Sequence, residues 1–203
     1  MILYGTPPTR ALRVEWLLRE LEIPFETVAI DPLNPDAYVP GFRTINPAAK
    51  IPVLVDGDTV MTESAAIPLW LAERDPERRF IPEDVDERGQ MYRWLFFLMT
   101  EIEAPLWRSA LHEVIYAEER RIPAEVDNAR RDAQAMLAVF EAHMTGRWYV
   151  VGERASVADF NAAYLMDWAR HAGLLDRCPA LAAFVDRMYA RPAAPMTIAQ
   201  GFA

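Results

Sequence analysis

Hydrophobic residues recur along the chain with two different spacings, and the change between them divides the sequence. In the first part, the pattern predicts a strand over residues 2–4 and a second strand over residues 25–30. Between them, Val14, Leu17, Leu18 and Leu21 recur at helical spacing behind polar neighbours. The proline-rich residues 31–41 predict a loop. A strand, a helix and a second strand therefore open the chain.

Residues 46–71 contain the densest group of local signals. The sequence predicts a strand over residues 53–55, an Asp56-Gly57 turn and a strand over residues 59–62, followed by a helix that begins at Glu63 and Ser64. Pro68 lies near the first turn, where proline removes at most one hydrogen bond, so we expect the helix to form. The predicted order, βαβ, a short α region and then ββα, resembles a thioredoxin fold with a mixed sheet.

The second half of the chain shows only helical spacing. Pro76 and Pro82 mark a linker, which we place at residues 76–85 between an α/β domain over residues 1–75 and an all-helical domain over residues 86–203. Pro105 is expected to kink or end the first long helix. Two apolar stripes predict the first two helices: Met91, Trp94, Leu95, Leu98 and Ile102, and then Ala133, Leu137, Phe140 and Met144.

Two further helices follow from local signals. Ser156 is expected to cap the third helix, with the Asp159 side chain reaching back to the backbone of the cap residue. Phe160, which follows directly, would be buried. Pro179 opens the fourth helix. Because the loss of a cap typically costs about 1 kcal/mol, this signal concerns folding and not catalysis.

Composition excludes several classes of function. The 203 residues are 52% hydrophobic and carry a net charge of −9, with 6 basic and 11 acidic residues in the first 75. The sequence has no basic segment, so we expect neither nucleic-acid binding nor binding to an anionic membrane. It also has no long apolar run and no secretory signal, and we expect a cytoplasmic protein. A single cysteine, Cys178, excludes an internal disulfide and a Cys-x-x-Cys redox pair.

The chemistry of residues 50–64 suits an amino-acid head group. Ser64 with the backbone N–H groups of a helix start could hold a carboxylate, and Glu63 an ammonium. Pro52 makes a cis Ile51–Pro52 bond affordable, which would turn the Ile51 backbone toward a peptide ligand. Lys50, the one lysine among 21 basic residues, would place a compact charge opposite a carboxylate. A solvated loop lysine and an ordinary N-cap serine are the alternative interpretations.

Together these residues form a long motif, which resembles the glutathione site of the cytosolic glutathione transferases. The motif is NPxxKIPVL from Asn46, the Asp56-Gly57 turn, and TESxAIxxxL from Thr62. The N-terminal residues, including Thr9 and Arg13, are similar to those of bacterial and theta-like members. The Ser156-x-x-Asp159-Phe160 box is similar to the family's capping box, so the resemblance covers essentially the whole chain.

The resemblance implies a role for each site residue. Lys50 would hold the glycyl end of glutathione, the segment Ile51–Pro52 its backbone, and Glu63 with Ser64 its γ-glutamyl end. Thr9, four residues before Arg13, stands where theta-like and delta-like members place a catalytic serine, and it would stabilise the thiolate. Thr6 and Tyr4 are alternative hydroxyl donors, and an N-cap of the first helix is the alternative interpretation of Thr9.

The chain also departs from the family pattern. Theta-like members place a histidine near the position of Ala37, and this sequence has none there. The glycyl carboxylate would then depend on Lys50, or on Arg43 or Arg10. The serine and cysteine cluster of the zeta class is absent, and no cysteine lies near Thr9, so we do not expect a protein thiol to take part.

The second substrate would bind between the domains, beside the first long helix. Large soft side chains suit an apolar electrophile, although helical packing in the core explains the same spacing. His112 and His143 lack the spacing of metal ligands, so no metal is expected. The candidate pocket residues are Trp94, Phe97, Met99, Trp107, His112 and Tyr116.

The resemblance implies a dimeric detoxification enzyme that joins the glutathione thiolate to an apolar electrophile. Two alternatives stay open. One is a disulfide-bond reductase that acts through two bound glutathione molecules. The other is a non-catalytic module that binds glutathione or a partner, for which the threonine in place of serine at position 9 is the main indication.

Overall fold

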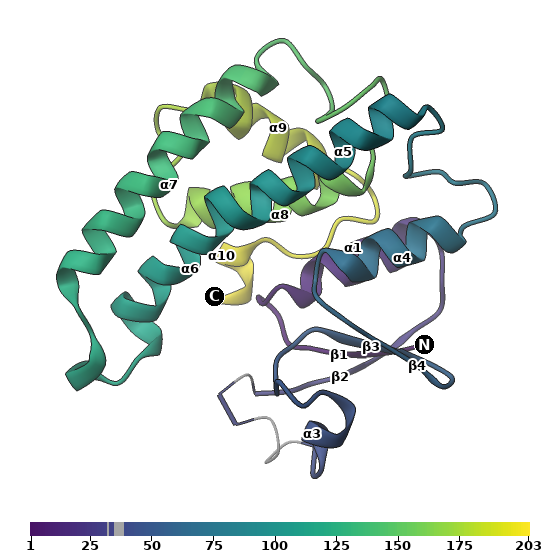
Figure 1. The fold of residues 1–203 in the computed structure, drawn as a ribbon, viewed down its shortest axis with the longest axis horizontal. Helices are drawn as coiled ribbons and strands as arrows, with labels where there is room; N and C mark the ends of the chain where they lie inside the picture. The colour runs from purple at the N-terminus through teal and green to yellow at the C-terminus, as the bar shows by residue number, and fades with distance from the viewer. Residues whose placement is uncertain (32, 35–38) are drawn as a thin grey trace.

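The computed structural model describes residues 1–31, 33–34 and 39–203, so Ala37 lies outside the described residues. The N-terminal domain alternates strands and helices around one sheet (Figure 1). Its elements are β1 (Ile2–Tyr4), α1 (Ala11–Glu20), β2 (Glu26–Val28), α3 (Phe42–Ile45), β3 (Val53–Asp56), β4 (Thr59–Thr62) and α4 (Ala66–Arg74). The second strand is shorter than the expected residues 25–30.

The four strands are ordered β2-β1-β3-β4. Strand β1 pairs parallel with β2 and antiparallel with β3, and β3 and β4 form the predicted antiparallel hairpin. The mixed, thioredoxin-like sheet that the sequence predicts is therefore confirmed. Pro68 lies in the first turn of α4, and the helix forms around it as expected.

Side chains alternate along the strands, so the two faces of the sheet pack against different parts of the protein. Leu3 and Leu54 belong to the main core, on the side where α1 and α4 lie (Figure 1). Tyr4 and Val53 face the other way and pack with Phe42 of α3. Because consecutive residues of a strand point to opposite faces, these short strands serve two separate hydrophobic clusters.

The C-terminal domain is helical, and the four predicted helices are present as its four longest. The helical segments after residue 84 are α5 (Val85–Phe97), η1 (Leu98–Glu103), α6 (Ala104–Ala110), η2 (Leu111–Ile115), η3 (Glu118–Arg120), α7 (Pro123–Met144), α8 (Val157–His171), α9 (Pro179–Tyr189) and α10 (Ile198–Gly201). Segments η1 and η2 are π-helical. Pro105 was expected to kink or end the first helix, but the change to π-helix comes earlier, after Phe97, and Pro105 lies in the first turn of α6.

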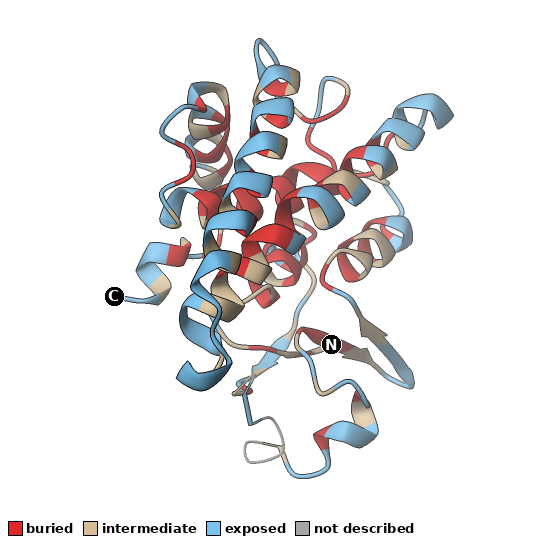
Figure 2. Cartoon of the chain, turned by 60° about the vertical axis from the view of Figure 1, so that its left-hand side comes forward, coloured by how far each residue is buried: buried red, intermediate tan, exposed pale blue. Residues whose placement is uncertain are grey.

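Helix α8 runs through the centre of the helical domain. Most of its residues are buried, and Figure 2 shows buried positions on nearly every side of it. One continuous core joins Leu3 and Leu54 of the sheet to Leu98 and Phe160 of the helical domain. The two domains are therefore packed as one body around shared side chains.

The C-terminal helix α10 packs against the loop between β1 and α1. Its first residue, Ile198, donates its backbone N–H to Oδ2 of Asp167 at 2.7 Å and joins a small cluster with Leu12 and Tyr164. A side chain at Gly201 would begin 2.5 Å from Cβ of Pro8, so only glycine fits this approach. The end of the described chain thus supports the loop that contains Thr9.

The predicted capping box of α8 is confirmed. Oδ2 of Asp159 accepts hydrogen bonds from the Ser156 N–H at 2.8 Å and the Ser156 hydroxyl at 2.9 Å. Oδ1 accepts a third bond from the Val150 N–H at 2.8 Å. Asp159 is fully buried. Its carboxyl is the sole partner described for two backbone N–H groups of the loop before α8, those of Val150 and Ser156.

The burial of Asp159 predicts a pH effect on stability. Burial raises the pKa of the Asp159 carboxyl from 3.8 to about 6. Between about pH 4 and pH 6, the Asp159 carboxyl keeps its proton in the folded protein and has lost it in the unfolded chain. Its contribution to the free energy of unfolding is therefore complete below about pH 4 and is lost as the pH rises through about 6. A shift of two units corresponds to about 3 kcal/mol.

Urea unfolding of the wild type and of Asp159→Asn, which cannot titrate at this position, measures the effect. We expect the advantage of the wild type in free energy of unfolding to shrink between about pH 4 and pH 7 by up to about 3 kcal/mol. An advantage that stays constant over this range would show that the carboxyl does not change its protonation state there.

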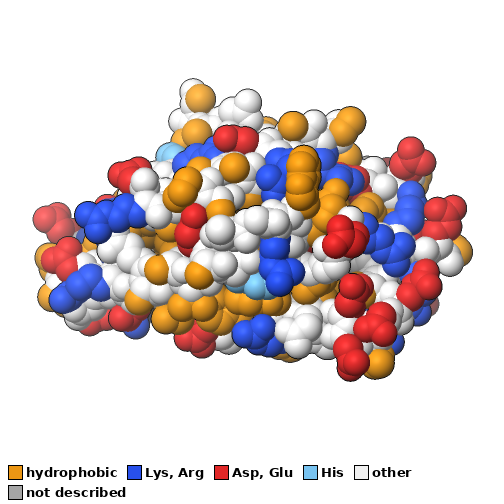
Figure 3. Space-filling model, turned by 90° about the horizontal axis from the view of Figure 1, so that it is seen from above, with side chains coloured by type: hydrophobic (Ala, Val, Ile, Leu, Met, Phe, Trp, Pro, Cys, Tyr) orange, Lys and Arg blue, Asp and Glu red, His pale blue; other side chains and the backbone are white. Residues whose placement is uncertain are grey.

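The surface mixes both signs of charge. On the face shown in Figure 3, acidic and basic side chains are interspersed with apolar residues, and several acidic side chains gather at the lower right. Within the described part of the chain, no helix combines the length and the apolar character that a bilayer crossing requires.

Candidate functional site

Asn46 holds the turn that presents Lys50. Its Nδ2 donates to the Lys50 carbonyl at 2.8 Å, and its Oδ1 accepts from the Ala48 N–H at 3.1 Å. The Lys50 side chain is exposed, and the Ile51–Pro52 bond that follows is cis, as the sequence suggested. No residue that the structure describes forms a hydrogen bond with the Ile51 backbone, so its N–H and C=O remain available at the start of β3.

Glu63 and Ser64 follow the end of β4, and they do not form the expected helix start. Helix α4 begins at Ala66 without a side-chain cap, and the Glu63 carbonyl accepts the N–H groups of Ala66 and Ile67, both at 3.0 Å. These two amides were expected to face a ligand and are already paired. Glu63 is exposed and has a φ of +68°, a conformation that costs energy in a non-glycine residue and often occurs at binding sites.

The Ser64 hydroxyl turns toward the interior instead. Ser64 is 8% exposed, and its Oγ accepts a hydrogen bond from Nη1 of Arg13 at 3.0 Å. An oxygen that accepts from arginine keeps its own proton for a further acceptor, such as a carboxylate. Ser64 therefore remains a candidate for an anionic ligand, although not as a helix cap.

The three candidate hydroxyls have different surroundings. Thr6 both donates to the Ile30 carbonyl at 2.7 Å and accepts from the Ile30 N–H at 2.9 Å, so its proton is already used. Tyr4 lies on the sheet face that packs against Phe42. Thr9 accepts one long bond, 3.4 Å, from the Ala11 N–H. Of the three, Thr9 has an unused proton at the start of α1.

Arg13 and Glu103 form a buried ion pair that links the domains. Nη2 of Arg13, in α1, donates to Oε2 of Glu103, the last residue of η1. The Arg13 side chain is 0% exposed and also donates to Sδ of Met99 at 3.4 Å. Its guanidinium carbon lies 4.6 Å from the ring centroid of Tyr164, in α8. The cation is therefore held by two segments of the helical domain, η1 and α8, and by Ser64.

Arg10 takes the second oxygen of the same carboxylate. Its Nε donates to Oε1 of Glu103, and its guanidinium carbon lies 4.6 Å from the Trp107 ring centroid and 5.4 Å from that of Trp168. Burial works to raise the pKa of Glu103, but the charges of Arg13 and Arg10 outweigh it and hold this pKa below its usual value. Glu103 is therefore ionised between two cations at neutral pH.

The six candidate pocket residues do not lie together. Trp94 is 4% exposed and packs with Phe97, Phe140 and the ring of His143, so it belongs to the core. His112 and Tyr116 contact each other, and Tyr116 also lies under Arg120. Trp107 contacts Arg10, and Met99 contacts Arg13. Of the six, Trp107 and Met99 are the two that contact residues just after Thr9 in the chain.

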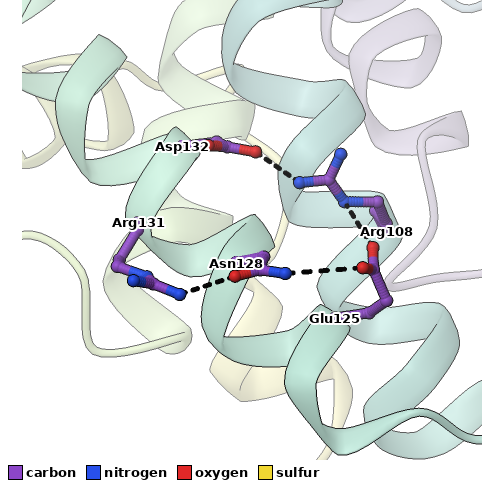
Figure 4. A pocket seen from close by; sticks show the side chains of 5 residues that line it. All are labelled: Arg108, Glu125, Asn128, Arg131 and Asp132. Carbon is purple, nitrogen blue, oxygen red and sulfur yellow. Dashed lines mark hydrogen bonds and ion pairs between the residues drawn. The ribbon is translucent and has the colours of Figure 1, made fainter.

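Two surface hollows lie away from the predicted glutathione site. One, of about 520 Å³, lies between α6 and α7, where the polar side chains pair with one another (Figure 4). Its lining residues are Arg108, Glu125, Asn128, Arg131 and Asp132. A second hollow, of about 410 Å³, is lined in part by Trp94 and His143, whose pKa is lowered by burial. Neither contains a residue of the predicted glutathione site.

Several important residues escaped the sequence analysis. Glu103 follows the apolar Ile102 with no motif around it, and Trp168 and Tyr164 read as ordinary core positions of α8. The one available signal was an acidic residue beside an apolar stripe, which is a weak indication of a buried pair. Among the described residues, no group of histidine, cysteine, aspartate and glutamate could hold a metal ion.

Comparison with known proteins identifies the family. Residues 1–73 match the model of the glutathione S-transferase N-terminal domain, and residues 91–192 match that of the C-terminal domain. Glutathione S-transferase F10 of Arabidopsis thaliana is 33% identical over 147 residues, which cover 70% of this chain and 68% of that protein. Protein URE2 of Meyerozyma guilliermondii is 32% identical over 142 residues, 66% of this chain and 46% of that protein.

Solved structures agree with this result. The structure of a sphingomonad glutathione S-transferase complexed with glutathione superimposes with a TM-score of 0.85 at 27% identity, and it covers 100% of both chains. Both domains, in the same order and over the same residues as the mixed sheet and the helical bundle, thus match one family. The chain belongs to the glutathione S-transferase family.

Proposed function

We propose that this protein binds glutathione and transfers its thiolate to an electrophilic co-substrate, with Thr9 as the group that stabilises the thiolate. The observation that carries the assignment is the position of Thr9. Its hydroxyl lies where the first loop meets α1, accepts only a long bond from the Ala11 N–H among the described residues, and keeps its proton. The family and the glutathione bound to the sphingomonad relative support the choice of thiol.

The rest of the tripeptide would lie along β3 and the start of α4. The free backbone of Ile51 pairs with the glutathione backbone as an added strand, beside Pro52. Ser64 donates to the γ-glutamyl carboxylate, and Glu63 binds the ammonium. The exposed Lys50 binds the glycyl carboxylate. Arg10 takes no part in this contact, because its side chain points to the helical domain.

One hydroxyl is sufficient for the required effect. A thiol with a pKa of about 8.5 is mostly protonated at neutral pH, and a two-unit fall needs about 2.7 kcal/mol. A hydrogen bond to a charged acceptor contributes about 1.5 to 3 kcal/mol, and a helix N-terminus about 0.3 to 1 kcal/mol more. Thr9 and the start of α1 together supply this amount.

The reaction is a nucleophilic displacement or addition. The glutathione thiol loses its proton to solvent, and the sulfur electron pair forms a bond to an electrophilic carbon. In a displacement, the leaving group departs with the electrons of the broken bond. No group of the protein changes its covalent state. We further propose that the protein acts as a homodimer in the cytoplasm, in the detoxification of such electrophiles.

Replacement of Thr9 tests the assignment. We expect Thr9→Ala to lower kcat/KM with a chlorodinitrobenzene about 10- to 100-fold and to raise the pKa of bound glutathione by one to two units, because one hydrogen bond to the thiolate is lost. The thiolate absorbance of the complex as a function of pH measures that pKa. Thr9→Ser keeps the hydroxyl and should stay near the wild type.

The exposed Thr100→Ala serves as a matched control and should change neither quantity, because the partners described for its hydroxyl are near neighbours along the chain, the Phe96 carbonyl and the Glu101 side chain. Unchanged turnover in Thr9→Ala would remove Thr9 from the role. Calorimetry provides the more basic test: no heat of association with millimolar glutathione would contradict the proposal as a whole.

Two other functions make different predictions. A reductase acting through two glutathione molecules would turn over small disulfides, and Cys178→Ala would leave that activity unchanged, since Cys178 is buried. A non-catalytic module would bind glutathione and turn over neither class of substrate. The URE2 match favours keeping the second alternative, because not all relatives are named as transferases.

A further inference from the structure

Arg10 is the accessible end of a charged cluster at the domain junction. Its side chain is 25% exposed, whereas that of Arg13 is 0% exposed and that of Glu103 is 10% exposed. Among the described residues, Glu103 is the only hydrogen-bond acceptor for Arg10, through Nε. The two terminal nitrogens of Arg10 therefore keep their N–H donors for a ligand.

The cluster carries an excess positive charge. Two guanidinium groups share one carboxylate, and each oxygen of Glu103 already serves one of them. A largely buried cation without a full counter-charge is costly, and an anion that binds beside it recovers part of that cost. Arg13 cannot reach a ligand, so the anion must approach Arg10.

The surroundings of Arg10 are aromatic. The rings of Trp107, from α6, and Trp168, from α8, both lie within 5.4 Å of the guanidinium carbon and are half-buried. A cation framed by two indole rings suits a ligand that is itself flat and aromatic, because such a ligand gains contact area with the rings while its anion meets the N–H donors.

We propose that Arg10, Trp107 and Trp168 select an aromatic co-substrate that carries a carboxylate or a similar anion. The inference rests on the proposed function and names the class of its second substrate. Arg10 follows Thr9 directly in the chain, so an anion held by its terminal nitrogens places the attached ring beside the sulfur that Thr9 stabilises. The contacts proposed for glutathione itself lie elsewhere, on Lys50, Ile51 and Ser64.

A matched pair of substrates tests the selection without any mutation. Chlorodinitrobenzoate and its methyl ester contain the same reacting carbon and differ in one negative charge. We expect the wild type to favour the carboxylate in kcat/KM by about tenfold, relative to the uncatalysed rates of the two compounds with glutathione. A ratio near one would overturn the inference.

Variants then test whether the preference for the carboxylate over the ester depends on Arg10. In Arg10→Gln the ratio should fall to near one, and in Arg10→Lys it should fall only partly, since the charge remains and the pair of donors is lost. Arg120→Gln is the matched control: Arg120 also lies over an aromatic ring, 3.7 Å from the centroid of Tyr116, but it belongs to η3. It should keep the ratio of the wild type.

The remaining outcomes separate the two proposals. If neither compound is turned over and glutathione does not bind, the proposed function fails. If Arg10→Gln weakens glutathione binding and slows both compounds equally, Arg10 serves glutathione and the inference fails alone. Quenching of tryptophan fluorescence by the unreactive dinitrobenzoate gives a readout free of turnover, and equal affinity for its methyl ester would also overturn the inference.

Discussion

Replacement of Asp159 by alanine is expected to lower the free energy of unfolding by about 3 to 5 kcal/mol. The carboxylate accepts three hydrogen bonds in a fully buried place, two of them from the backbone N–H groups of Val150 and Ser156. Alanine would leave these donors without partners, and each buried donor that loses its partner costs about 1 to 3 kcal/mol. Chemical denaturation followed by circular dichroism measures the change.

Asp84→Ala provides the matched control for this experiment. Asp84 caps α5 with the same chemistry, since its Oδ1 accepts from the N–H groups of Asp86 and Glu87, but it is exposed. Water can replace the lost carboxylate there, so we expect a loss of about 1 kcal/mol. If the two variants were equally destabilised, burial would not be what makes Asp159 important.

Glu103→Ala is expected to cost about 3 to 5 kcal/mol as well, for a different reason. The variant leaves the fully buried guanidinium of Arg13 without its counter-charge, and the Ser64 hydroxyl and Met99 sulfur that remain carry no charge. Because the pKa of Glu103 is lowered in the folded state, the stability that it contributes is present above its usual pKa and is lost as the pH falls. Denaturant titrations at neutral and acidic pH measure both effects.

Glu113→Ala is the control for this second prediction. Glu113 pairs with Arg130 on the surface, where both side chains are more than one third exposed, and such pairs contribute less than about 1 kcal/mol. Glutathione binding provides a further measurement. Glu103 holds Arg13 in place, and Arg13 donates to the Ser64 hydroxyl, so the loss of Glu103 also releases Ser64. Wild-type stability in Glu103→Ala would show that the buried pair is replaced by another contact.

The sequence was sufficient for the fold because its signals are local. The Asp56-Gly57 turn between two short strands, the Ser156 and Asp159 box, and the change of hydrophobic spacing after Pro82 each depend on residues close together in the chain. The mixed sheet and the helical bundle follow from them. The predicted helix begins two residues later, at Ala66, and the Ser64 side-chain cap was wrong, since a distant residue, Arg13, binds its hydroxyl.

The site could be predicted only in part. The residues of one continuous motif, from Lys50 to Ser64, were found through resemblance, and their roles stay predictions. The contacts of Arg10 with Glu103, Trp107 and Trp168 join residues up to 158 positions apart, and no local pattern announces them. The orientation of Trp94 toward the core likewise depends on Phe140 and His143, which lie on another helix.

The π-helical winding of η1 gives the domain junction a tolerance to a change in chain length. A π turn contains more residues than an α turn, so removal of one residue between Leu98 and Glu103 would let the segment rewind as an ordinary α-helix. The rewinding would absorb the lost residue and leave the later side chains facing the same way, whereas the same deletion within an α-helix would rotate them by about 100° around the axis. This segment is therefore a place where the helical domain could lose a residue during evolution without a change in how the following helix packs.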